Sequence, residues 1–105
     1  MPEAVKITLT GVSGRKYGFV VNALDADFTG VSAVYPITRK LDGEHMVLYI
    51  RQTGDLSDRF NDHHKMRCFD ENGANCLCVH RDADKDSRLQ KEADLIAHYH
   101  PICNV

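Results

Sequence analysis

Three groups of side chains in the sequence have types and spacings that suit chemistry on an anion. Arg59 lies four residues before His63, so on a helix the two side chains share a face and could converge on one anion. Glu92 borders an apolar stripe, where a carboxylate either lies at the rim or needs a partner. Tyr35 and Tyr49 occupy the two arms of an expected hairpin, where paired tyrosines most often serve only sheet packing. Each group alone therefore also has an ordinary structural interpretation.

Strands are expected to position most of these residues. Five segments have the alternation or the short apolar runs typical of strands: 5–10, 17–21, 31–38, 45–50 and 75–80. The first two are joined by a glycine-containing turn and predict an N-terminal hairpin. The third and fourth are joined by Asp42-Gly43, a strong hairpin turn signal. Pro36 removes one ladder donor, so we expect a bulge or an unpaired position there.

Two segments are predicted to be helices. Asp55 can cap the first, whose apolar face begins at Leu56. The capping box Ser87-Arg88-Leu89-Gln90 opens the second, which stops before Pro101. Its inward stripe is expected to hold Leu89, Ala93 and Ile96.

The length of the hairpin turn decides whether the two tyrosines can share a site. A two-residue Asp42-Gly43 turn would place Tyr35 and Tyr49 on opposite faces of the sheet. A three-residue loop over 41–43 would place them on one face, and a bulge at Pro36 would also change the parity. We predict one of the latter two arrangements, with both phenols on one face.

The composition is that of one ordinary folded domain spanning residues 1–105. The chain has a mass of 11.8 kDa, with 43% hydrophobic and 27% charged residues, which argues against wholesale disorder. The formal net charge of −2 excludes a strongly basic coat protein but allows a local basic patch. No apolar run reaches the roughly 18–20 residues of a membrane helix, and the N-terminus lacks a signal-peptide pattern. We therefore expect a cytoplasmic protein without a membrane partner.

The four cysteines have two interpretations. Without a secretion signal, we expect Cys68, Cys76, Cys78 and Cys103 to be reduced thiols. Cys76 and Cys78 are too close along one strand to bridge each other. Together with His80 the four could ligate zinc, but a lone Cys-x-Cys differs from the paired knuckles of structural zinc sites. Buried or half-buried thiols are the expected state.

Five short motifs follow one another along the chain: Ala33-Val34-Tyr35, Tyr49-Ile50-Arg51, Arg59 with His63, Lys91-Glu92-Ala93, and Pro101-Ile102-Cys103-Asn104. In this order and spacing they resemble the GIY-YIG nuclease domain. The first motif of that family is Gly-Ile-Tyr on a strand, and the second is Tyr-Ile-Gly on the return strand. Arg51 stands where the second motif has its last glycine. The resemblance covers about residues 31–105 and does not explain the first 30.

The resemblance implies a fold and a set of roles. The fold would be α+β, a small antiparallel sheet flanked by helices, to which residues 1–30 would add an N-terminal β-hairpin. Tyr35 would act as, or assist, the general base on the attacking water, and Tyr49 would hydrogen-bond the water or the phosphate. His63 would carry a proton or contact the phosphate, and Asn104 would help to hold the site together.

The resemblance also implies how the site would handle charge. In phosphodiester cleavage, charge accumulates on the phosphate oxygens and on the leaving oxygen. Arg59 would bind the phosphate, with Arg51 as a second contact, and Glu92 would bind Mg²⁺ or Mn²⁺. Because Mg²⁺ takes one or two carboxylates together with waters and phosphate oxygens, a single carboxylate is sufficient.

The predicted function is therefore a metal-dependent nuclease, and more specifically an endonuclease. Its partner would be nucleic acid, with DNA favoured over RNA. Two alternatives stay open: a catalytically inactive module of the same type that binds nucleic acid or protein, and a cysteine/histidine zinc protein. Because nothing resembles an attached DNA-recognition domain, a homodimer or a targeting partner protein also stays open.

Overall fold

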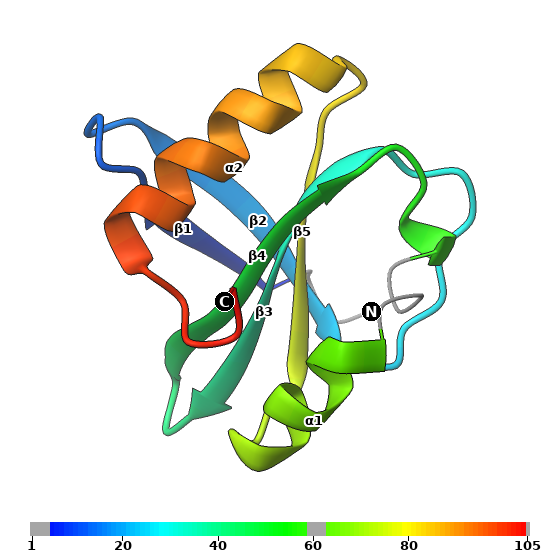
Figure 1. Cartoon of the computed structure of the whole chain (residues 1–105), viewed down its shortest axis with the longest axis vertical. Coiled ribbons are helices and arrows are strands. Elements are labelled where there is room, and N and C mark those ends of the chain that lie inside the picture. Colours follow the sequence, from blue (N-terminus) through cyan, green and yellow to red (C-terminus); the bar gives the residue numbers. More distant parts are fainter. Residues whose placement is uncertain (1–4, 59–62, 105) are drawn as a thin grey trace.

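A curled antiparallel sheet of five strands forms the centre of the computed structural model, which describes residues 5–58 and 63–104 (Figure 1). The strands are β1 (Lys6–Thr10), β2 (Lys16–Ala23), β3 (Ala33–Leu41), β4 (Glu44–Thr53) and β5 (Cys76–Arg81). The helices are the 3₁₀ turn η1 (Leu56–Asp58), α1 (His63–Glu71) and α2 (Lys85–Tyr99). The strand order is β1-β2-β5-β3-β4. The predicted α+β class and the five predicted strands are confirmed.

The two α-helices pack on opposite faces of this sheet. On one face, Tyr35 and Ile37 of β3 pack in a buried cluster with Phe69 of α1. On the other face, Val34 packs in a second buried cluster with Leu95 of α2. Because successive side chains of a strand point to opposite faces, β3 contributes to both clusters.

The hairpin of β3 and β4 combines a two-residue turn with a bulge. Asp42 and Gly43 have φ angles of 54° and 81°, as a tight type I′ turn requires. The pairing then shifts by one residue, because Leu48 is inserted opposite the peptide bond that follows Ile37. The turn has two residues in place of the predicted three, and the bulge lies opposite Ile37 and Thr38 in place of Pro36. Both predicted ways of changing the register are therefore wrong in detail.

The bulge nevertheless brings the two tyrosines to one face of the sheet. Beyond it, Tyr35 pairs with Arg51 and Ile37 pairs with Tyr49. Residues two apart on a strand point to the same face, and the ring centroids of the tyrosines lie 6.5 Å apart. The prediction that both phenols share a face is confirmed. The ladder between β3 and β5 is interrupted between Val34 and Ile37, which confirms the expected unpaired position at the proline of β3.

Helix α2 begins earlier and presents a different face than the sequence predicted. Asp84 is the N-cap residue and accepts a hydrogen bond from the backbone of Asp86, so the predicted capping box is wrong. The buried residues of α2 are Arg88 and Leu95, whereas Leu89 is 40% exposed. The predicted inward stripe is therefore wrong for Leu89 and Ala93, which are exposed, whereas Ile96 is half-buried and packs against the cluster of Leu95 as predicted.

A disulfide joins α1 to the C-terminal segment. Cys68 and Cys103 are bonded, with their Cα atoms 5.9 Å apart, while Cys76 and Cys78 are free and buried. The prediction of four reduced thiols is therefore wrong for the first pair. Two of the candidate zinc ligands are consumed, and the described residues hold no group of three or more metal-ligating side chains.

The disulfide also bears on cellular location. Disulfides persist mainly in oxidising compartments, so the bond between Cys68 and Cys103 disagrees with the reduced thiols that we expected of a cytoplasmic protein. None of the described helices is both long and apolar enough to cross a bilayer.

A carboxylate clamp holds the turn between β1 and β2 against α2. Asp94 accepts hydrogen bonds from the Tyr17 hydroxyl at 2.7 Å, the Ser13 hydroxyl at 2.7 Å and the Ser13 backbone N–H at 2.9 Å. A Cβ atom at Gly11 would lie 1.9 Å from the carboxylate, so the clamp requires glycine there.

Acid should weaken this clamp. Hydrogen bonds from Tyr17 and Ser13 hold the pKa of Asp94 below its ordinary value. The ionised carboxylate therefore stabilises the fold above the unfolded-state pKa of about 4, and this contribution is lost as the pH falls through the lower folded-state pKa. Asp94→Asn should lower the melting temperature near neutral pH and should lose less further stability on acidification than the wild type. Thermal unfolding across pH tests this, with the exposed Asp25→Asn as control; identical acid profiles for wild type and Asp94→Asn would contradict it.

Candidate active site at the edge of β4

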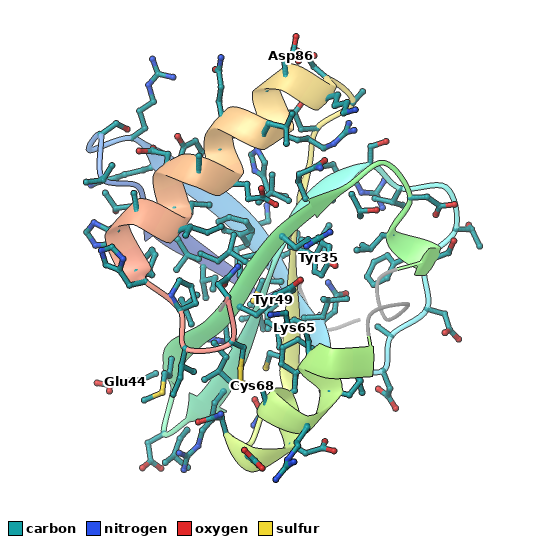
Figure 2. All side chains as sticks on the ribbon, viewed as in Figure 1. Tyr35, Glu44, Tyr49, Lys65, Cys68 and Asp86 are labelled. Carbon is teal, nitrogen blue, oxygen red and sulfur yellow. A yellow bond between two sulfur atoms is a disulfide. The ribbon has the colours of Figure 1, made fainter. Side chains whose placement is uncertain are left out.

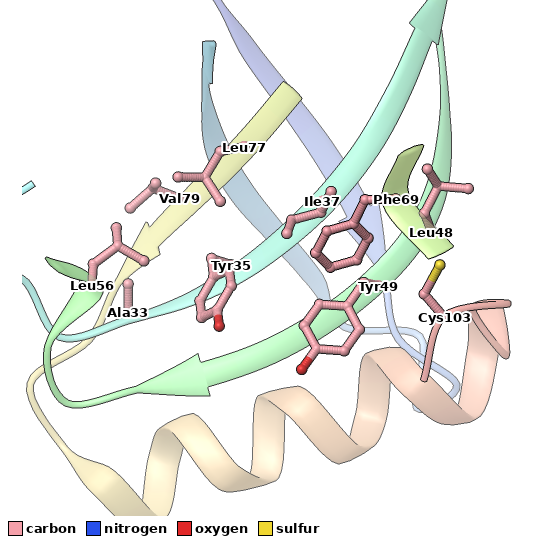
Figure 3. Packing of buried hydrophobic residues seen from close by; sticks show 10 residues of the cluster. All are labelled: Ala33, Tyr35, Ile37, Leu48, Tyr49, Leu56, Phe69, Leu77, Val79 and Cys103. Carbon is pink, nitrogen blue, oxygen red and sulfur yellow. The ribbon is translucent and has the colours of Figure 1, made fainter. Parts of the chain in front are cut away.

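The two tyrosines of the predicted site lie side by side on the face that α1 covers. Tyr35 is 3% exposed and Tyr49 is 4% exposed. Figure 3 shows their rings next to each other in the buried cluster, with both hydroxyl oxygens directed to the same side. Phe69 of α1 packs edge-on against Tyr49, with ring centroids 5.3 Å apart. The aromatic cluster therefore fixes the orientation of both phenols.

Arg51 connects these phenols with the acidic residue of the site. The pKa of Arg51 is raised above its ordinary value, chiefly by electrostatic interaction with Tyr49. A hydrogen bond with the same phenol and electrostatic interactions with Tyr35 and Glu92 raise the pKa of Arg51 further, while partial burial opposes them. Because the side chain is exposed, the guanidinium can meet an anion from solvent. The predicted phosphate contact thus lies among three of the predicted site residues.

A second cation, Lys65, lies beside the same phenol. Its Nζ atom is 5.9 Å from the ring centroid of Tyr49, within the range of a cation–π interaction. Figure 2 shows Lys65 of α1 next to Tyr49 near the centre of the view. Sequence reasoning missed this residue, because no motif marks it and its position depends on how α1 docks.

Glu92 lies at the edge of β4, where its carboxylate accepts a backbone hydrogen bond. Its Oε2 atom is 2.7 Å from the N–H of Gln52. The side chain of Gln52 accepts a hydrogen bond of 3.0 Å from Arg88 Nε. No ion pair joins Glu92 to Arg88 in the part of the chain that the structure describes, so the partner of the half-buried carboxylate is the backbone of β4.

Asn104 binds the same edge of β4 through its side-chain amide. It accepts a hydrogen bond from the N–H of Ile50 at 2.8 Å and donates one to the carbonyl of Ile50 at 2.9 Å. The backbone N–H of Cys103 donates to the carbonyl of Leu48 at 2.8 Å. The C-terminal segment therefore pairs with the outer edge of β4 in the way that a further strand would.

Two predicted site residues are not located. Arg59 lies outside the described residues. His63 is the first residue of α1, and its side chain also lies outside the described part. Their proposed roles stay predictions.

Glu92 is the carboxylate on which the predicted metal site depends. One carboxylate oxygen is occupied by Gln52, and the group as a whole stands beside the exposed guanidinium of Arg51. Mg²⁺ is commonly held by one or two carboxylates, with waters and substrate phosphates completing its coordination. A divalent cation at Glu92 would need waters and phosphate oxygens for the rest of its coordination, and its binding stays a prediction.

Comparison with known proteins identifies no relative of this chain. A scan against protein-family models finds no matching model, and searches of curated proteins and of solved structures find no match.

Proposed function

We propose that the chain is a metal-dependent nuclease that hydrolyses phosphodiester bonds in nucleic acid at the edge of β4. The observation that carries the proposal is the position of Arg51 among residues from β3, β4 and α2. Arg51 pairs with Tyr35 and lies two residues after Tyr49 on the same face. Glu92 of α2 accepts the N–H of the next residue, Gln52. Two phenols, an exposed guanidinium and a carboxylate are a suitable set for binding a phosphate and moving a proton. The motif resemblance over residues 31–105 points to the same chemistry.

Each residue of the cluster has a distinct task in this proposal. Arg51 would neutralise the charge that develops on the phosphate oxygens. Tyr35 would take the proton of the attacking water, because cations beside a phenol favour its charged form. Lys65 lies over the ring of Tyr49, and Arg51 interacts with both phenols, so these two residues supply that positive charge. A divalent cation held by Glu92 would supply electrostatic stabilisation of the leaving oxygen.

A second candidate is an inactive module that binds nucleic acid without cleaving it. Two observations favour it: both phenols are almost completely buried, and the carboxylate of Glu92 already serves β4 through the N–H of Gln52. In this candidate Glu92 and the tyrosines are structural, and only the cations would contact the ligand.

Cleavage assays with conservative variants separate the two candidates. Purified protein would be incubated with single-stranded, duplex and branched DNA and with RNA, in Mg²⁺, in Mn²⁺ and in chelator. Glu92→Gln keeps an oxygen that can accept from Gln52 but removes the charge, so it should reduce cleavage by about 10³-fold while the melting temperature is preserved. Tyr35→Phe should reduce cleavage by about 10²–10⁴-fold.

The controls make either outcome decisive. Glu92→Ala removes both the charge and the hydrogen-bond acceptor, so its melting temperature reports the structural role separately. Binding without cleavage in every metal would overturn the nuclease and support the inactive module. Cleavage that survives in both Glu92→Gln and Tyr35→Phe would place the activity at another site or in a contaminant.

A further inference from the structure

A cavity of about 420 Å³ is lined mainly by residues of β2 and β5 and borders the buried cluster that holds Tyr35 and Tyr49. We call it the β2–β5 cavity. Its apolar lining includes Val20, Val79 and Phe28, and its charged residues are Lys6 and Arg81. Among the described lining residues there is no carboxylate, so the cavity combines apolar surface with positive charge. Ligands of complementary chemistry are anions that carry a flat apolar group.

Strand register places Lys6, Val20 and Val79 of the lining on the same face of the sheet as the proposed site, whereas the lining residues Phe19 and His80 belong to the opposite face. Lys6 pairs with Val20, and Val20 pairs with Val79. Val79 belongs to the same buried cluster as Tyr35, and Tyr35 in turn pairs with Arg51. Paired residues share a face, and neighbouring strands lie about 4.8 Å apart, so the row from Lys6 to Arg51 extends roughly 19 Å across the sheet.

Arg81 continues the positive charge along this face. It pairs with Ala33 of β3, which lies two residues before Tyr35 and points to the same face. The side chain of Arg81 is exposed. Lys6, Arg81 and Arg51 therefore distribute three cations over a face that ends at the proposed site. A polyanion lying along the face could contact all three, whereas a small anion would meet only one or two.

Gly18 leaves the floor of the cavity open. It is exposed in the middle of β2, and a Cβ atom built there would have no heavy atom within 4 Å. Its backbone is held in place by the ring of His80, whose Nδ1 lies 2.9 Å from the Gly18 carbonyl oxygen. Phe28 adds an aromatic side chain to the lining. A flat ring can thus lie against β2 without displacing a side chain.

From these observations we propose that the β2–β5 cavity binds an unstacked base of single-stranded nucleic acid, with Lys6 and Arg81 on the adjoining phosphates. The strand would then run across the sheet toward Arg51. The bases of a duplex are stacked and paired and cannot enter such a cavity, whereas a single strand can present them to aromatic surfaces. This inference rests on the proposed function and specifies its substrate as single-stranded.

Binding in chelator tests the inference independently of cleavage. Fluorescence anisotropy would compare a labelled single strand of about 12 nucleotides with a duplex of the same sequence. The single strand should bind at least about tenfold more tightly. Gly18→Val fills the floor and should weaken single-strand binding by about tenfold or more, since stacking of one base is worth that much. Ala23→Val, an exposed position on the opposite face of the same strand, should leave binding unchanged.

The charged residues have their own expected signature. Lys6→Ala combined with Arg81→Ala should reduce the slope of log affinity against log salt by roughly 1.4, about 0.7 for each lost phosphate contact on a single strand. Lys85→Ala, an exposed cation at the start of α2, is the matched control. This double variant also tests the proposal if Gly18→Val does not fold.

The outcomes separate the inference from the proposed function. Single-strand binding that depends on the cavity, without cleavage in any metal, would support the inference and overturn the nuclease. Cleavage or binding that is unaffected by Gly18→Val and by the double charge variant would overturn the inference and leave the nuclease standing. Equal or tighter binding of the duplex would also overturn it.

Discussion

Replacing Arg51 with alanine should lower the rate of phosphodiester cleavage by about 10²–10³-fold, the cost of removing one preorganised charge from a transition state. The fold should be unaffected, because the side chain is exposed and β4 keeps its backbone pairing with β3. The loss should appear in kcat more than in KM, since the charge on the phosphate oxygens grows as the reaction proceeds. Steady-state kinetics with a labelled single strand measure both.

Two further variants make this prediction specific to the guanidinium. Arg51→Lys keeps the charge but loses the planar, bidentate donor set, so it should recover only part of the rate. Arg39→Ala removes an exposed arginine from the far end of the same hairpin and should cleave like the wild type. If Arg51→Ala and Arg39→Ala behave alike, Arg51 is not part of an active site.

The disulfide should provide the largest single contribution to stability. It links residues separated by 35 positions, and chain-entropy arguments assign about 4 kcal/mol to closing a loop of that length in the unfolded state. Cys68→Ser together with Cys103→Ser should therefore lower the free energy of unfolding by about that amount. Urea denaturation of the wild type and the double variant measures the difference.

Reduction provides the internal control for this prediction. A dithiol reductant should bring the wild type down to the stability of the double variant and should leave the variant unchanged. Cys76→Ala should respond to reductant as the wild type does, because that thiol is free. Titration of four thiols in the unreduced, denatured protein would contradict the disulfide.

The strands could be predicted from the sequence because their signals are local. Alternating apolar residues and the Asp42-Gly43 turn specify strands and a hairpin within short windows. The face shared by Tyr35 and Tyr49 followed from parity, once a register change was assumed. The position of the register change could not be predicted. A bulge can insert its extra residue at many points along β4, and the local sequence does not show that Leu48 is the inserted residue.

The helix face and the disulfide depend on contacts between distant parts of the chain. The stripe of Leu89, Ala93 and Ile96 looks inward by periodicity alone, yet α2 turns Leu95 and Arg88 toward the sheet. Arg88 is stabilised there by Gln52 and by the carbonyl oxygen of Asp82, partners that no spacing rule identifies.

The candidate site could be predicted in part for the same reason. The order of the motifs predicted several site residues that the structure locates on or beside β4: the two tyrosines, Arg51, Glu92 and Asn104. The hydrogen bonds of Glu92 and Asn104 to β4 could not be foreseen. They require the middle of α2 and the C-terminal segment to meet a strand that lies 40 and 54 residues earlier. Lys65 was missed because its helix docks through the aromatic ring of Phe69.

The pairing of the C-terminal segment with β4 has a consequence for association between copies of the chain. β4 is the last strand of the sheet order, and a bare final strand is a template on which a second molecule can continue the sheet, leading to polymers or fibrils. The amide of Asn104 occupies the donor and acceptor of Ile50 that such a neighbour would use. A homodimer built by joining two sheets at β4 would first have to displace this C-terminal segment. A fusion or truncation that disturbs the segment would expose the backbone groups of β4, and a second molecule could then extend the sheet.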